Sequence, residues 1–240
     1  KVYDIIKNRE NKGHLAFLYQ QSVKYSEPLF FRRKKLVEKY VQSVQAFLTV
    51  LPRTPKNHVF QYIHDLFIYD RGAKLDMFLK DVEVLERSYP EGELFDTALR
   101  VLVKTYWIKD EVFVAHQLIS PLKKHFDHQL YGNLGTDHKV THINRPHFDI
   151  GPFKFEFDLN SKPWMLRFMR HARWLRGILP TWHAKERKIA LRVRAAILKD
   201  IPGLPEAQRR KPLVSLDNIK GYREVRYQAA EKAWSGLSEA

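Results

Sequence analysis

Histidines and carboxylates cluster in one part of this sequence, and such residues can hold a metal ion. Six of the eleven histidines lie between residues 116 and 147, where Asp127 and Asp137 also fall, and Asp149 follows two residues later. His138 and His142 could share a metal if they sat on one helical turn. The surrounding Gly, Thr, Asn and Pro residues instead favour extended chain, in which these two positions are about 13 Å apart. We therefore interpret the cluster as polar loop histidines that titrate or form hydrogen bonds, and we predict no metal site.

Other catalytic constellations do not assemble in this sequence. The absence of cysteine excludes thiolate catalysis, Cys-ligated zinc and Cys-bound iron-sulfur clusters within the 240 residues. Gly132 and Gly135 lack the strand, helix and further glycines of a nucleotide loop, and no G-x-S-x-G elbow is present. Helical residues one or two positions apart point about 100° or 200° apart, so we interpret the pairs Asp110–Glu111 and Asp81–Glu83 as surface charge. We expect no catalytic residue and no cofactor in this chain.

The segment "PWMLRFMRHARWLRG", residues 163–177, contains four arginines and two tryptophans. Helical spacing predicts an apolar core stripe on one side of it, formed by Met165, Phe168, Met169, Ala172 and Leu175. The arginines fall on the other side, and no acidic residue occurs between Lys162 and Lys185. Three interpretations remain open for this basic side: arginines paired with carboxylates that the fold brings in, a protein-docking surface, or a phosphate-binding surface. The candidate contact residues are Arg167, Arg170, Arg173, Trp174, Arg176, Trp182, Lys185 and Arg223.

The overall composition is that of a folded, basic protein. Of 240 residues, 44% are hydrophobic and 13% aromatic, and the formal net charge is +15. Residues 161–240 contain 18 Lys and Arg but only 7 Asp and Glu. Such a charge favours phosphates, an acidic protein or an anionic membrane surface as partners.

No apolar run approaches the ~20 residues that cross a bilayer, so we expect no membrane insertion. Because the sequence begins with Lys1 rather than Met, we expect a processed or excised piece.

Apolar residues recur at intervals of three and four along most of the chain, which predicts a mainly α-helical fold. We expect a helical bundle of antiparallel helix pairs, with an N-terminal helical extension over residues 1–57 and a helical domain over 58–236. Alternating apolar residues predict a short β hairpin or extended segment near 138–159. Three later helices are expected over residues 163–177, 184–198 and 215–234, with a Pro-rich connection before the last.

Three blocks of the sequence resemble the helical C-terminal domain of indolepyruvate-type 2-oxoacid:ferredoxin oxidoreductases. The first is "YIHDLFIYDRGAKLDMFLKDVEVLE" followed by "GELFDTALRVLVKTYWIKDEVFVAHQL". The second is "PWMLRFMRHARWLRG", and the third is "IKGYREVRYQAAEKA". In order and at comparable spacing they cover about residues 58–236.

The resemblance implies an accessory role rather than a catalytic one. Enzymes of that family convert an aryl 2-oxoacid and coenzyme A to an acyl-CoA, using thiamine diphosphate with Mg and iron-sulfur clusters, and pass electrons to ferredoxin. The similar domain would be a cytoplasmic, non-catalytic helical scaffold or docking domain that packs against catalytic subunits or domains supplied elsewhere. Its basic surface would receive an acidic electron carrier such as ferredoxin.

A rival hypothesis follows from the charge, the size and the composition of the chain. A compact, strongly basic, cysteine-free chain of this size also fits an accessory protein of a large ribonucleoprotein, such as an organellar ribosome in the mitochondrial matrix. It would then bind RNA through the phosphates.

Overall fold

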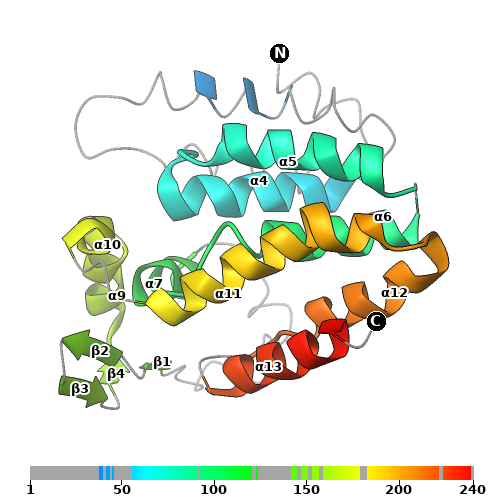
Figure 1. Ribbon diagram of the computed structural model, residues 1–240. Helices are drawn as coiled ribbons and strands as arrows, with labels where there is room; N and C mark the ends of the chain where they lie inside the picture. The colour runs from blue at the N-terminus through cyan, green and yellow to red at the C-terminus, as the bar shows by residue number, and fades with distance from the viewer. Residues whose placement is uncertain are drawn as a thin grey trace, which may run out of the picture. The chain divides into compact units, whose positions relative to one another are not determined.

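A computed structural model describes most of the chain, and the described part is mainly α-helical, which confirms the fold class predicted from the sequence (Figure 1). The described residues are 56–90, 92–120, 142–144, 147–150, 153–156, 159–178, 183–221 and 224–238, with single positions at 38, 39, 42, 43, 45 and 123. The helical extension expected over residues 1–57 lies almost wholly outside them.

The chain divides into two compact units. Unit 1 combines Lys1–Ile108 with Lys185–Ala240, and unit 2 is Lys109–Ala184. Our sequence analysis did not propose this division, in which the chain leaves unit 1, forms unit 2 and then returns.

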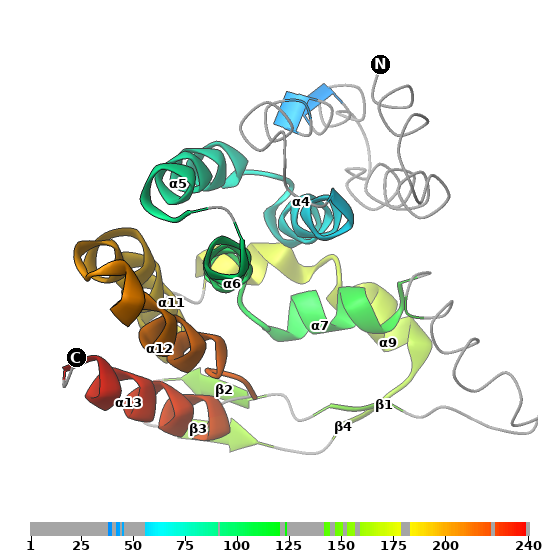
Figure 2. The same cartoon turned by 90° about the vertical axis from the view of Figure 1, so that its right-hand side faces the viewer.

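Unit 1 contains a helical hairpin formed by α4 (Lys56–Asp70) and α5 (Leu75–Ser88). The two helices lie side by side, joined by a four-residue turn (Figures 1 and 2). Arg71 and Gly72 both have positive φ, and the Arg71 amide donates to the Phe67 carbonyl at 2.8 Å. A Cβ on Gly72 would lie 2.6 Å from Cδ1 of Leu75, so glycine is required both by its φ and by the close packing.

Helix α6 (Glu93–Val103) packs beside α5 and contributes to the same core. Both helices bury apolar side chains at intervals of three and four residues, as the sequence pattern predicts. The buried side chains include Phe78, Val82 and Leu85 from α5 and Phe95, Ala98, Leu99 and Leu102 from α6.

Helix α11 (Ala184–Ala195) brings the chain back to unit 1 and continues into a π-helical turn, η3 (Ala196–Asp200). The sequence predicts one helix from 184 to 198 here. A π turn shifts the backbone hydrogen bonds by one residue. The Ile197 carbonyl accepts a hydrogen bond at 2.7 Å from the hydroxyl of Tyr89, the residue that follows α5. This buried bond joins the end of α5 to η3 within unit 1.

The C-terminal part of unit 1 differs from the prediction. A 3-10 turn, η4 (Ile201–Gly203), leads into α12 (Glu206–Asp217), and α13 (Glu224–Ser238) follows after a break. The predicted Pro-rich connection and single helix over 215–234 are therefore wrong. Pro205 stands at the N-cap of α12, where its missing N–H costs nothing, and Pro212 lies inside the helix, which still buries Leu213 and Leu216. Gly221, with φ +96, precedes α13.

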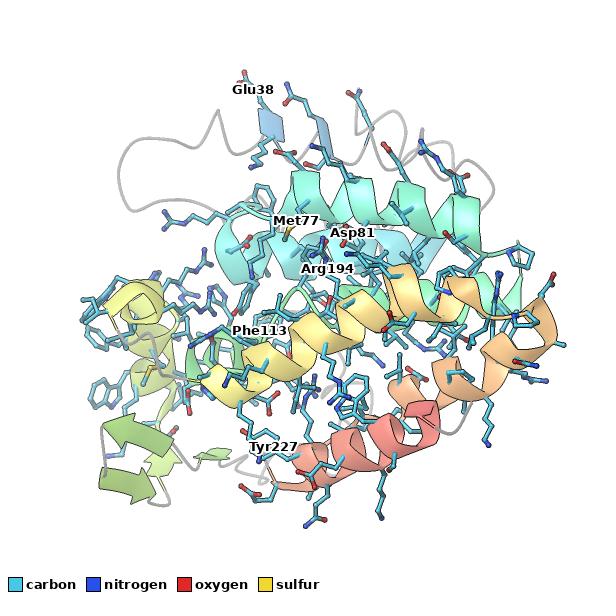
Figure 3. All side chains as sticks on the ribbon, in the orientation of Figure 1. Glu38, Met77, Asp81, Phe113, Arg194 and Tyr227 are labelled. Carbon is cyan, nitrogen blue, oxygen red and sulfur yellow. The ribbon has the colours of Figure 1, made fainter. Side chains whose placement is uncertain are left out.

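A buried carboxylate joins three segments of unit 1. Asp81 on α5 is 6% exposed and accepts hydrogen bonds from the Tyr106 hydroxyl and from Arg194 on α11, whose Nη2 is 2.7 Å from Oδ1. Figure 3 shows Asp81 and Arg194 next to each other. Burial, and then the hydrogen bond to Asp81, raises the pKa of Tyr106 above its usual value, so its hydroxyl stays a donor. The interpretation of Asp81 as surface charge is therefore wrong.

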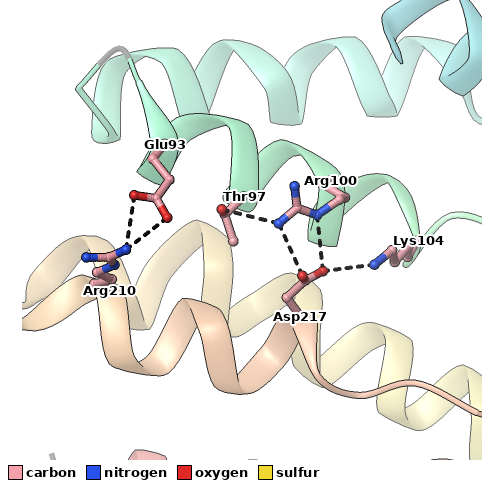
Figure 4. Close-up of polar contacts among 6 residues, drawn as sticks. All are labelled: Glu93, Thr97, Arg100, Lys104, Arg210 and Asp217. Carbon is pink, nitrogen blue, oxygen red and sulfur yellow. Dashed lines mark hydrogen bonds and ion pairs between the residues drawn. The ribbon is translucent and has the colours of Figure 1, made fainter.

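A second carboxylate joins α6 to α12 (Figure 4). Asp217 receives hydrogen bonds from Arg100 at 3.1 Å and from Lys104 at 2.9 Å. Burial alone would raise the pKa of Asp217, but the bonds from Arg100 and Lys104 outweigh it and lower that pKa below its usual value. An exposed pair between Glu93 and Arg210 joins the same two helices.

Helix α13 is attached to α11 by charge and by aromatic contacts. Arg226 lies 2.8 Å from the buried carboxylate of Glu186. Two cations of α11 lie over rings of α13. The Lys185 ammonium is 4.0 Å from the centre of the Tyr227 ring, and the Arg192 guanidinium is 4.2 Å from Trp234.

Unit 2 consists of short helices and short strands. It contains α7 (Glu111–Leu118), α9 (Pro163–Met169), a 3-10 turn η2 (Ala172–Trp174) and α10 (Leu175–Ile178). Between the helices, β1 (His142–Asn144) pairs antiparallel with β4 (Leu159–Ser161), and β2 (His147–Ile150) pairs antiparallel with β3 (Phe153–Glu156). Helices α7 and α9 lie side by side (Figure 2).

Within the part of the chain that the structure describes, none of the helices combines the length and apolar character needed to span a membrane.

Replacing Asp81 tests the buried ion pair of unit 1. We expect Asp81→Ala to lower the free energy of unfolding by about 2–3 kcal/mol, because the buried Tyr106 hydroxyl and the partly buried Arg194 guanidinium then lose their acceptor. Urea unfolding followed by circular dichroism measures the change. The matched control is Glu86→Ala, an exposed site on the same helix, for which we expect a change within about 0.5 kcal/mol. Equal effects of the two substitutions would contradict this assignment.

The Asp217 contacts predict a dependence of stability on pH. Because the folded-state pKa of Asp217 is lowered, its contribution is present at neutral pH and is lost as the pH falls below about 4. We expect Asp217→Asn to destabilise the protein by roughly 1 kcal/mol at pH 7, and the difference from the wild type to shrink in acid. Urea unfolding at pH 7, 5 and 3 measures this. Asp200→Asn, at an exposed site, is the control, and a wild-type to Asp217→Asn difference that stays constant with pH would refute the prediction.

Candidate functional site

The basic segment singled out in the sequence forms α9, η2 and α10 of unit 2. Pro163 stands at the first position of α9, as predicted, where its missing N–H is harmless. The predicted continuous helix over 163–177 is interrupted, because α9 ends at Met169 and a turn at Arg170 and His171 precedes η2. The interruption changes which side chains face inward.

The inward face of the segment packs on α7. Val112 of α7 and Ala172 of η2 are buried against each other, with Met169 and Leu175 packed around them. Three members of the predicted core stripe therefore contribute to packing. Phe168 does not, since it is 75% exposed, and Leu166 is buried instead. The prediction for Phe168 is wrong because α9 buries its Leu166 side, and Phe168, two positions further on, points about 200° away from Leu166 around the helix.

An ion pair attaches α10 to the start of α7. Asp110 is the N-cap of α7 and accepts a hydrogen bond from the Phe113 amide at 2.8 Å. The same carboxylate receives Nε of Arg176 at 2.6 Å and its Nη2 at 2.9 Å. Asp110 is only 2% exposed, so this two-bond contact lies in a low-dielectric environment where charge-assisted bonds are strong. Asp110, like Asp81, is thus not surface charge.

A neutral histidine attaches the middle of the segment to α7. His116 is 5% exposed, and its Nε2 lies 3.0 Å from Nη2 of Arg173. Burial, followed by the positive charges of Arg173 and Arg170, lowers the pKa of His116 to about 2. The ring is therefore uncharged at neutral pH, and Nε2 accepts the hydrogen bond that Arg173 donates.

A third polar contact lies beside the Asp110 site. His183, which has a φ of +57, places Nε2 2.9 Å from Oε2 of Glu111. Both side chains are about nine-tenths buried. Positive φ in a residue other than glycine costs energy, so the surrounding contacts must compensate for it.

The outward face carries large apolar side chains. Trp164 is 65% exposed, Phe168 75%, Trp174 61% and Ile178 64%. Lys162 and Arg167 are also exposed on the same segment. We call these six residues the α9–α10 face.

The structure separates the predicted contact residues. Arg167 and Trp174 are exposed on the α9–α10 face, and Arg170 is partly buried. Arg173 and Arg176 are used in the internal contacts with His116 and Asp110, so for these two the fold does bring in partners. Lys185 belongs to unit 1, where it is exposed and lies over the Tyr227 ring. Trp182 and Arg223 lie outside the described residues.

Sequence reasoning missed several residues of this site. Asp110 and His116 were interpreted as surface charge and as a loop histidine, yet both are buried. A usable signal was present for Asp110, because it stands two residues before the apolar run Val112–Ala115, where an Asp is a typical N-cap. Trp164 and Phe168 had no such signal.

A metal centre is not apparent in the described residues, among which no three potential ligands converge. His116 is held by Arg173, while His125, His128 and His138 lie outside the described residues, as do Asp127 and Asp137. The interpretation of those five residues stays a prediction.

Comparisons with known proteins identify no relative: no family model, no curated protein and no solved structure matches this chain.

The environment of His116 predicts how its ring titrates. We expect the His116 ring resonances in NMR spectra to stay unchanged from pH 8 to pH 5, because the folded protein holds the neutral form. In the urea-unfolded chain the same histidine should titrate near 6.5. Since only the unfolded state then takes up a proton, each pH unit below about 6.5 costs up to about 1.4 kcal/mol of folding stability. A midpoint near 6.5 in the folded protein would refute the buried, neutral assignment.

Proposed function

We propose that this chain is a non-catalytic helical scaffold or docking domain of an indolepyruvate-type 2-oxoacid:ferredoxin oxidoreductase. It packs against catalytic subunits or domains supplied elsewhere. The observation that carries the proposal is that the polar residues of the three resembling blocks serve as internal anchors between helices.

The first block supplies several of these anchors. Its "LKDVEVLE" stretch contains Asp81, which receives Arg194, and its "TALRVLVK" stretch contains Arg100 and Lys104, which hold Asp217. These contacts connect positions 113 to 117 residues apart. A motif whose residues hold distant helices together describes an architecture rather than an active site.

The "YWIKDE" turn shows the same use of polar residues. Tyr106 donates to Asp81, Asp110 caps α7 and receives Arg176 of the second block, and Glu111 contacts His183. In the third block Arg226 lies against Glu186. Each block therefore contributes residues that support a helical scaffold.

The cofactors implied by the resemblance would lie outside this chain. Iron-sulfur clusters are held by Cys thiolates, and the 240 residues contain none, so the residues present do not fit a cluster. Thiamine diphosphate with Mg would likewise be held by the catalytic subunits. The contribution of this domain is binding, with an acidic carrier such as ferredoxin attracted by the basic surface, and its compartment in this reading is the cytoplasm.

One observation favours the rival role. Lys185, Lys188, Arg192 and Lys199 are all exposed along α11 and η3 of unit 1, and such a row of cations attracts phosphates. In that role the protein would belong to a ribonucleoprotein, such as the ribosome of the mitochondrial matrix. Two of these cations are positioned by the aromatic rings of α13. The row has no base-reading motif beside it, so it would bind RNA without sequence preference.

Native mass spectrometry of the assembly purified from its source decides between the two roles. We expect this chain at fixed stoichiometry with thiamine-dependent subunits, and no retained RNA at about 150 mM salt. Retained RNA that dissociates with a steep dependence on salt, together with the absence of thiamine-dependent subunits, would refute the oxidoreductase role. Lys188→Glu serves as the matched variant, because it should weaken RNA retention and leave an oxidoreductase complex intact.

A further inference from the structure

Exposed large apolar side chains are concentrated on α9 and α10. Among the described residues nine large hydrophobic side chains are exposed, and four of them, Trp164, Phe168, Trp174 and Ile178, fall between residues 164 and 178. Scattered exposed hydrophobics are normal on a protein surface, but four of them within one short segment are typical of an interaction site.

The apolar side chains of this face are presented by a segment that is held from behind. Arg176 binds the buried Asp110, Arg173 contacts the neutral His116, and Met169 and Leu175 pack against Val112 and Ala172. Two aromatic anchors on a pre-positioned helix lose little conformational freedom on binding, which is typical of residues that dominate interface energies.

The charge of the face selects its partner. Lys162 and Arg167 are exposed, and no acidic residue occurs between Lys162 and Lys185. A second copy of the same face would bring like charges together, which disfavours self-association through it. An acidic partner removes this repulsion and adds favourable pairs at the rim.

The balance of apolar and charged groups distinguishes protein from RNA. Interfaces with nucleic acid are strongly polar and positively charged, and their aromatic residues alternate with cations that follow the phosphates. Here four large apolar side chains, one of them the aliphatic Ile178, accompany two exposed cations. That composition matches the apolar centre and charged rim of a protein interface.

We propose that the α9–α10 face is a docking site for an acidic protein surface with an apolar centre. The proposal rests on the docking role proposed above and locates it in unit 2. Trp164 and Phe168 are the apolar anchors, and Arg167 supplies the charge that favours an acidic partner.

Fluorescence anisotropy with defined probes tests the site in the full 240-residue chain. The probe is a labelled 20-residue helical peptide with Glu on its polar face and Leu and Phe on its apolar face. Its twin carries Lys in place of Glu, and a 20-nucleotide oligouridine is the RNA probe. The variants are Trp164→Ala, Phe168→Ala and Arg167→Glu, all at exposed positions. Leu191→Ser, at a 65% exposed site on α11, is the matched control.

We expect the Glu peptide to bind at least about 10-fold more tightly than the Lys peptide, and Phe168→Ala or Trp164→Ala to weaken it about 10-fold. Arg167→Glu should weaken it several-fold, rising salt should weaken it further, and Leu191→Ser should leave it unchanged. Three results would overturn the proposal: equal binding of the two peptides, equal effects of Leu191→Ser and Phe168→Ala, or oligouridine displacing the Glu peptide. Self-association that Phe168→Ala abolishes would also overturn it.

The probes contain no oxidoreductase subunit, so the two proposals can fail separately. A face that binds the acidic peptide, in a protein that purifies without thiamine-dependent subunits, would refute the oxidoreductase role and leave the docking site standing. An intact oxidoreductase complex in which this chain does not bind the acidic peptide would refute the docking site and leave the oxidoreductase role standing.

Discussion

The buried carboxylate of Asp81 is the interaction on which the architecture of unit 1 depends. Taking a carboxylate and a guanidinium out of water is costly, and the cost is recovered only when geometry and additional hydrogen bonds are good. Asp81 meets both conditions, since Arg194 reaches it with two nitrogens and Tyr106 donates its hydroxyl. The contact therefore requires α5, the end of α6 and α11 to be in place together, although Asp81 and Arg194 are separated by 113 residues.

Unit 2 is likewise held together by buried polar groups that contact arginines. Asp110 neutralises Arg176, and His116 receives Arg173 without carrying charge, because a protonated ring beside that guanidinium would be repelled in a buried site. These contacts hold η2 and α10 against α7, together with the apolar packing of Met169, Ala172 and Leu175 on Val112. These contacts also use two of the four arginines of the segment, so a count of basic residues overstates how much charge that segment offers to a partner.

What remains at the surface then determines what the protein can do. On residues 162–178 of unit 2 the exposed large side chains are mainly apolar, accompanied by Arg167 and Lys162, whereas in unit 1 the exposed row on α11 and η3 is cationic. The two surfaces have different chemistry and would bind different partners. A basic protein need not bind nucleic acid through each of its arginine-rich segments, because the fold decides which arginines face water.

The sequence by itself determined the mainly α-helical class, the buried positions of α5 such as Phe78 and Val82, and the start of α9 at Pro163. These follow from local rules, since helical periodicity and capping involve residues only a few positions apart. Tertiary structure decided the rest. The exposure of Phe168 depends on which side of α9 enters the core, and that side carries Leu166. Helix α12 forms in a Pro-rich stretch because Leu213 and Leu216 have a core to enter. Tertiary structure also determined the pairing of Asp81 and Asp110 with arginines, because no local sequence pattern predicts which distant side chain will neutralise a buried charge.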